Sequence, residues 1–125
     1  MIPLSINFTL EEFQCHCGCG LKPNQYSLEF KDFVIKLQAI RDKCGFPLHI
    51  NSGIRCKKYN DSLSDSVSDS SHLKGIAVDI AIADDYSRGI FLDAVYKIEI
   101  HRIGIAKRFI HIDVDKTKNN AAWLY

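Results

Sequence analysis

Residues 71–80, Ser71-His72-Leu73-Lys74-Gly75-Ile76-Ala77-Val78-Asp79-Ile80 (SHLKGIAVDI), set a histidine before a glycine and an aspartate within the apolar run that follows. Side chains alternate across a β-strand, so Ile76, Val78 and Ile80 share one face of a strand expected over residues 76–82. Asp79 lies on the other face, flanked only by alanines. The stretch therefore predicts a strand with a core face and a polar face that has room above it.

A second segment, Phe109-Ile110-His111-Ile112-Asp113-Val114, has the same design. Its isoleucines and valine alternate with His111 and Asp113, which fall on the opposite face. Each of the two expected strands therefore offers one apolar and one polar face.

A cavity between such polar faces, with His72 delivered from the turn at Gly75, would bring His72, Asp79 and His111 together. Two imidazoles and one carboxylate suit zinc, and three protein ligands leave a fourth position for water, as in catalytic sites. Zinc lowers the pKa of a bound water from about 15.7 to roughly 7, which predicts hydrolysis of a carbonyl compound. Judged from spacing alone, the simpler alternative is that these histidines and the aspartate form a hydrogen-bonded pair or lie on the surface.

The whole chain is expected to form one domain, residues 1–125. It has 125 residues, of which 46% are hydrophobic and 25% charged. A net charge of +1 without a long basic run argues against nucleic acid or an anionic membrane surface as partner. The start, MIPLSINFTLEEF, lacks a signal-peptide pattern, and no window approaches the roughly 20 apolar residues of a membrane span. We expect synthesis in the cytoplasm.

The remaining patterns predict an α+β fold with a mainly antiparallel sheet and helices packed against it. A capping box begins a short helix, and apolar spacing marks two longer helices. The polar stretch 60–71 is expected to be a loop, and Lys107-Arg108 can turn a hairpin. The expected helices are 10–13, 28–44 and one from Asp84 or Asp85 through Val95; the expected strands are 48–51, 76–82, 101–106 and 109–114.

These motifs together resemble the zinc D-Ala-D-Ala peptidases, cell-wall carboxypeptidases and endopeptidases that share a fold with the hedgehog signalling domain. The resemblance covers nearly the whole chain. It implies that His72, Asp79 and His111 are zinc ligands and that the substrate is a peptidoglycan peptide. The matching segments are Ser70 to Ile80, Ser52-Gly53-Ile54-Arg55, Asn60, Phe109 to Asp113, Phe8 to Phe13, Arg41-Asp42 and Trp123-Leu124-Tyr125.

The resemblance also implies roles for residues around the metal. Arg55 matches an arginine that can polarise the scissile carbonyl and hold the oxyanion, and Ser70 matches a serine near the substrate. Asp113 is the nearest candidate for the general base. Its alternative role is to orient a ligand histidine or an arginine, and His101 is a third possibility for the base.

Three departures from the family pattern leave the reaction less defined. Relatives commonly carry an acid shortly before the second zinc histidine, whereas this chain has Lys107-Arg108-Phe109-Ile110. Ile54 replaces a tyrosine, and paired glycines are absent from residues 61–67, so the bond cleaved stays open. The missing acid favours the alternative of a non-catalytic, metal-containing binding module. As an enzyme, the chain fits a small viral-type lysis protein that acts on the cell wall after release.

Five cysteines, an odd number, include the cluster Cys15-His16-Cys17-Gly18-Cys19. A second metal site there would need Cys44 or Cys56. Alternate cysteines fit the usual ligand spacing of structural zinc poorly. Sequence alone therefore favours disulfides to Cys56 or reduced thiols over a second ion, and does not choose between these two.

Overall fold

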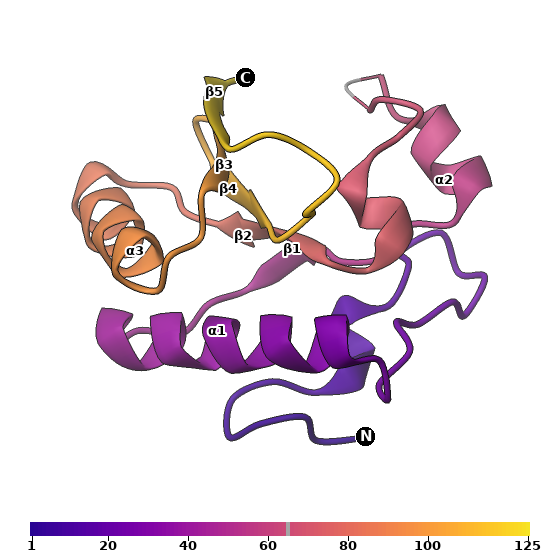
Figure 1. Ribbon diagram of the computed structural model, residues 1–125, viewed down its shortest axis with the longest axis horizontal. Coiled ribbons are helices and arrows are strands. Elements are labelled where there is room, and N and C mark those ends of the chain that lie inside the picture. The colour runs from indigo at the N-terminus through magenta and orange to yellow at the C-terminus, as the bar shows by residue number, and fades with distance from the viewer. Residues whose placement is uncertain (65) are drawn as a thin grey trace.

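A five-stranded sheet forms the centre of the computed structural model, which describes residues 1–64 and 66–125. The strand order is β1-β2-β4-β3-β5 (Figure 1). All neighbours pair antiparallel except β3 and β5, which are parallel. The expected α+β class with a mainly antiparallel sheet is confirmed. The strands are β1 Ile50–Ser52, β2 Ala77–Ala81, β3 Arg102–Ile105, β4 Phe109–Asp113 and β5 Ala121–Leu124.

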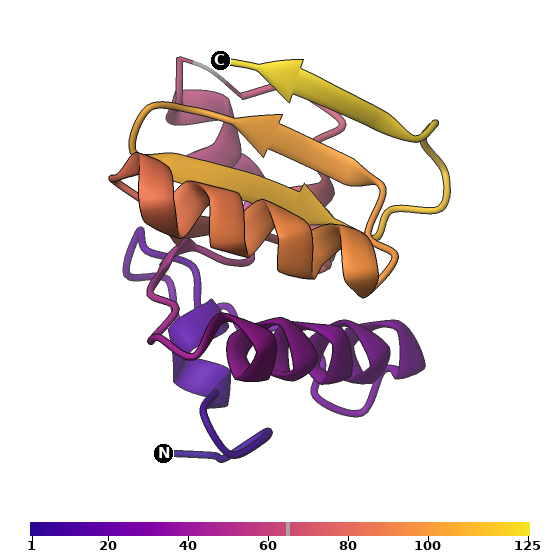
Figure 2. The same cartoon turned by 90° about the vertical axis from the view of Figure 1, so that its left-hand side faces the viewer.

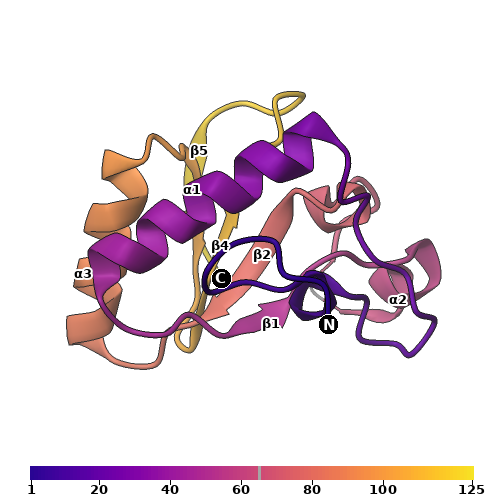
Figure 3. The same ribbon diagram turned by 90° about the horizontal axis from the view of Figure 1, so that it is seen from below.

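Two long helices, α1 (Leu28–Cys44) and α3 (Asp85–Lys97), pack against each other and against the sheet (Figures 2 and 3). Both are capped as their sequences predict. The Ser27 hydroxyl accepts a hydrogen bond from the Phe30 N–H at the start of α1, and Gly45 ends it with a left-handed φ of 72°. Asp84 caps α3.

The core lies between these helices and one face of the sheet. The inward side chains of β2 and β4 meet aromatic and aliphatic residues from both helices, and burial of each contributes about 1.5–3 kcal/mol. The opposite face of β2 and β4 is left for polar groups. The central core residues are Val78, Ile80, Ile110, Ile112, Phe33, Leu37, Ile40, Phe91 and Val95.

The N-terminal segment packs on the turn after β1. It contains the short 3₁₀ helix η1 (Leu10–Phe13), whose capping box is confirmed by the bond from the Thr9 N–H to the Glu12 carboxylate. The Phe13 carbonyl accepts from the Ile54 N–H at 2.9 Å. A Cβ on Gly53 would lie 2.5 Å from the same carbonyl oxygen, so only glycine permits this approach.

The expectation of a loop over 60–71 is wrong at both ends, because helix α2 (Lys57–Ser62) and the 3₁₀ helix η2 (Ser71–Lys74) extend into it. Helix α2 is polar and lacks the apolar periodicity that marks a longer helix. Asp65, part of the expected loop, lies outside the described residues. Strand β5 was not expected. Among the helices of the described residues, none combines the length and apolarity that a membrane crossing requires.

Candidate metal centre

The register of the sheet assembles a row of residues across all five strands. Ser52 of β1 lies opposite Asp79 of β2, which lies opposite His111 of β4. His111 in turn faces Gly104 of β3, and Gly104 faces Trp123 of β5. Paired residues in neighbouring strands share a face, so the row forms the floor of a site on the face opposite the core.

His72 reaches this floor from η2, which precedes β2. The Ser70 hydroxyl accepts a hydrogen bond from the His72 N–H at 3.3 Å and caps the helix. Gly75 ends η2 with a φ of 74°, a conformation that favours glycine. A Cβ there would also crowd Ile54 and Pro23 at 3.3 Å. The chain therefore turns tightly and returns as β2 beneath the His72 ring.

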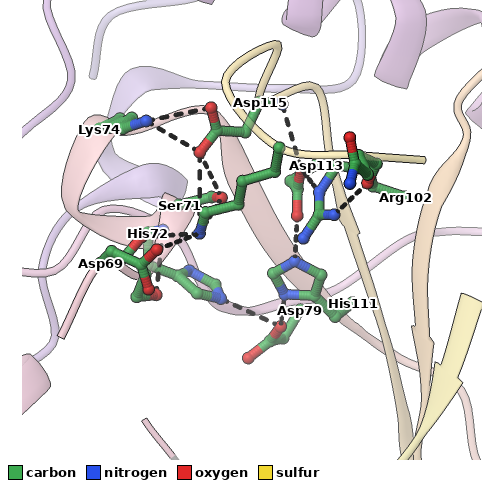
Figure 4. Close-up of polar contacts among 12 residues, drawn as sticks. Asp69, Ser71, His72, Lys74, Asp79, Arg102, His111, Asp113 and Asp115 are labelled. Atoms are coloured by element: carbon green, nitrogen blue, oxygen red, sulfur yellow. Dashed lines mark hydrogen bonds and ion pairs between the residues drawn. The ribbon is translucent and has the colours of Figure 1, made fainter. Parts of the chain in front are cut away.

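The three side chains expected to meet do so (Figure 4). One ligand atom from each of His72, Asp79 and His111 lies within 4.8 Å of the others. Asp79 Oδ1 is 3.2 Å from His72 Nε2 and 3.0 Å from His111 Nδ1. All three residues are buried, with exposed fractions of 3%, 8% and 5%.

The outer nitrogen of each ring is held by an acceptor. His72 Nδ1 lies 2.7 Å from the Gly53 carbonyl oxygen, and His111 Nε2 lies 2.7 Å from Asp113 Oδ2. A carbonyl or carboxylate oxygen only accepts, so both outer nitrogens carry hydrogen. In the neutral rings the inner nitrogens then present lone pairs toward Asp79, which is the tautomer that metal ligation requires.

The charge balance of the site fits a cation. Burial lowers the pKa of His72, which keeps its ring neutral, so its Nε2 lone pair faces a carboxylate. Burial also opposes ionisation of His111, but hydrogen bonds with Asp113 and Asp79 outweigh it and raise its pKa. A divalent ion would satisfy both inner nitrogens and replace the proton on His111.

Asp79 is held in its ionised form. Burial would raise its pKa, but the hydrogen bond with His111 and the neighbouring ring of His72 outweigh burial and lower the pKa well below its usual range. Its second oxygen, Oδ2, lies 3.2 Å from the Arg55 guanidinium. The carboxylate is therefore charged at neutral pH and available to a metal ion.

A family description named Peptidase M15 matches residues 6–113 of the chain. The chain belongs to the Peptidase M15 family. No curated protein matches it. Peptidases of this family are zinc-dependent, and the His-Asp-His cluster supplies the imidazole and carboxylate donors that zinc binds. The general class of this Peptidase M15 chain is therefore metallopeptidase, which is the class that its motifs predict.

A cleft of about 660 Å³ opens over the His-Asp-His cluster of this Peptidase M15 chain. Arg55 enters it from the turn after β1, with its Nε donating to the Ser52 hydroxyl at 3.1 Å. The cleft thus brings Arg55, Ser70 and Asp113 around His72, Asp79 and His111. Its other lining residues are Leu63, Ser64, Ser66, Val67, Ser71, Arg102, Phe109, Lys118, Ala121, Trp123 and Tyr125.

Asp113 is buried, and both of its carboxylate oxygens accept hydrogen bonds. Oδ2 accepts from His111, while Oδ1 accepts from Arg102 Nε at 2.8 Å and from the Asp115 N–H at 3.0 Å. Arg102 also lies over the Trp123 ring at 5.1 Å from its centroid. His101, the third possibility for the base, is exposed and does not line the cleft.

Arg102 was missed in the sequence, although a signal for it was present. Two strands joined across Lys107-Arg108 pair Ile103 with Ile112, and one step further places Arg102 opposite Asp113. The register of the expected hairpin therefore already implied that Arg102 and Asp113 are neighbours.

A second polar network fixes η2 on the segment after β4 (Figure 4). Asp115 accepts from the Ser71 hydroxyl at 2.7 Å and from Lys74 Nζ at 3.0 Å. Burial would raise the pKa of Asp115, but hydrogen bonds from Thr117 and Ser71 outweigh it and lower the pKa. This buried carboxylate anchors the residue next to His72, and sequence reasoning did not find it.

Proposed function

We propose that this chain is a zinc peptidase that hydrolyses peptide bonds in peptidoglycan stem peptides, as a D-Ala-D-Ala carboxypeptidase or an endopeptidase. The observation that carries the proposal is the convergence of His72, Asp79 and His111 at the floor of a cleft that also contains Arg55. Family membership supports the general reaction, and the motif resemblance supports the cell-wall substrate.

In this proposal His72 binds zinc through Nε2, His111 through Nδ1 and Asp79 through a carboxylate oxygen. Once bound there, zinc would supply a Lewis acid and would lower the pKa of a bound water to about 7. The carbonyl of Gly53 and the carboxylate of Asp113 keep the two rings in the ligating tautomer.

Arg55 is proposed to stabilise the developing oxyanion. Bonds to Ser52 and Asp79, together with a longer contact of 3.5 Å to Asn60 Oδ1, fix its guanidinium beside the metal-binding residues. Only 12% of its side chain is exposed, so its charge acts in a partly desolvated cleft. A fixed donor in such surroundings stabilises negative charge more strongly than a mobile surface arginine.

Asp113 is proposed to act through His111. Both of its oxygens already accept hydrogen bonds, and its position against His111 Nε2 favours the orienting role over proton abstraction from water. The alternative role of general base predicts a different outcome for substitution at this position.

The lining of the cleft supports a short anionic peptide as substrate. Arg55, Arg102 and Lys118 bring positive charge, and Ser70 lies beside His72 as a proposed substrate contact. Trp123 and Tyr125 form an aromatic wall, with the indole 5.4 Å from the His111 ring between centroids. Stem peptides carry free carboxylates, which match the basic groups.

The proposal is tested by incubating the full chain with purified bacterial sacculi and zinc, and analysing the soluble products by mass spectrometry. We expect new amino or carboxyl termini at one type of stem-peptide bond, lost on chelation and restored by zinc. An Asp79→Ala variant is the matched inactive control. Intact muropeptides after prolonged incubation with zinc-loaded protein would refute peptidase action on this substrate.

A metal-containing binding module is the second candidate function. Both carboxylates that line the cleft, Asp79 and Asp113, are already held by hydrogen bonds or ion pairs. Among the described lining residues no other carboxylate is left to act as a general base, which favours this second function. The same sacculus experiment separates the two functions, because zinc-dependent sedimentation with sacculi without release of termini indicates binding alone.

A further inference from the structure

We propose that Cys15, Cys17, Cys19 and Cys56 bind a second zinc ion through four thiolates, as a structural site apart from the His-Asp-His centre. All four Sγ atoms lie within 4.8 Å of one another. Two separations are 3.5 Å, Cys15 to Cys17, and 3.6 Å, Cys17 to Cys56. Tetrahedral zinc with Zn–S bonds of about 2.3 Å places its sulfurs about 3.8 Å apart.

Backbone N–H groups point at three of the four sulfurs. The Cys56 N–H donates to Cys15 Sγ at 3.4 Å, and the Tyr59 N–H to Cys56 Sγ at 3.4 Å. The Leu21 N–H donates to Cys19 Sγ at 3.5 Å. Such donors stabilise negative charge on sulfur and fix its direction, as supporting hydrogen bonds do around metal ligands.

The fold explains how alternate cysteines form one site. Gly18 and Gly20 have φ angles of 89° and 83°, so the loop curls where other residues would be strained. The fourth sulfur comes from Cys56, the N-cap of α2. The spacing of the cysteines in the sequence argued against a metal site, because spacing alone does not show how the loop curls. Cys44 packs against the main core and is not part of the cluster.

The proposed ion would join two distant parts of the chain. It links the loop 15–19 to Cys56, the residue after Arg55. The Arg55 N–H also donates to the His72 carbonyl at 3.0 Å. The second ion would thus hold the turn that carries Arg55 in place, while its binding is independent of any reaction in the cleft.

The test is the zinc content of the full chain, purified under reducing conditions and dialysed against trace zinc. Elemental analysis should give two ions per chain for the natural sequence and for the matched control Cys44→Ser. It should give one ion for Cys17→Ser and one for His111→Ala. This metal readout is unaffected by whether the chain cleaves peptidoglycan.

Cobalt substitution gives a second readout that does not need a cysteine variant to fold. Cobalt-loaded His111→Ala protein should retain thiolate-to-cobalt charge-transfer absorption in the near ultraviolet and strong tetrahedral bands in the visible. The proposal is refuted if Cys17→Ser binds as much zinc as the natural sequence, or if cobalt-loaded His111→Ala lacks these bands. Disulfides among the four cysteines in anaerobically purified protein, seen in the intact mass before and after reduction, would also refute it.

Discussion

Replacing Asp113 with asparagine tests how the metal centre is held. Asp113 Oδ1 accepts two hydrogen bonds, from Arg102 and the Asp115 N–H, while Oδ2 accepts one from His111. Asparagine has one oxygen, and the two donors at the Oδ1 position hold it there. The amide NH₂ then faces His111 Nε2, which must become an acceptor.

This change forces His111 into the wrong tautomer. Its hydrogen moves to Nδ1, the atom that lies 3.0 Å from Asp79 Oδ1 and would bind the ion. Loss of a supporting partner of a ligand histidine typically lowers metal affinity 10–100-fold, or about 1.4–2.7 kcal/mol. We expect Asp113→Asn to weaken zinc binding at the His-Asp-His site by this factor.

The assay is competition for zinc against a chromophoric chelator at pH 7, followed by kcat on muropeptides at saturating zinc. Asp93→Asn is the matched control, because Asp93 is exposed and pairs only with Lys97 among the described residues. An unchanged zinc affinity with kcat lost would refute the orienting role and indicate that Asp113 is the base.

Three further changes probe other parts of the site. Arg55→Ala should lower kcat by a factor on the order of 10²–10³ while elemental analysis still finds metal at the centre. Gly104→Ala would place a Cβ 2.5 Å from Trp123 Nε1, so we expect a loss of about 1–3 kcal/mol in urea melts and a shift in emission of this single tryptophan. Burial opposes ionisation of Asp115, but its hydrogen bonds lower its pKa below the usual value, so its stabilising effect is complete at neutral pH and is lost as the pH falls below about 4. Asp115→Asn should therefore destabilise by about 3 kcal/mol at pH 7 and by progressively less as the pH falls below about 4, and a destabilisation that stays constant down to the lowest pH at which the protein folds would contradict this account.

The centre of the fold could be predicted from sequence because its signals are local. Alternation in 76–82 and 109–114 separates core from polar faces, and a two-residue turn fixes the β3–β4 register. Once β2 pairs with β4, Asp79 and His111 necessarily lie side by side. The convergence of His72, Asp79 and His111 followed from these rules together with the turn at Gly75.

The remaining parts depend on contacts distant in sequence. Strand β5 is a short edge strand that pairs parallel to β3, and nothing in Ala121-Ala122-Trp123-Leu124 alternates enough to indicate it. Helix α2 lacks an apolar stripe. The cysteine cluster depends on the position of Cys56 after folding, which spacing within residues 15–19 does not contain.

The chain ends leave the molecule on opposite sides (Figure 1). Tyr125 follows β5 at the rim of the cleft, whereas Met1 emerges beyond α1. A fusion partner or affinity tag joined at the carboxyl end would therefore crowd the entrance of the cleft. The same addition at the amino end leaves that entrance open, which makes it the better choice for immobilising the protein.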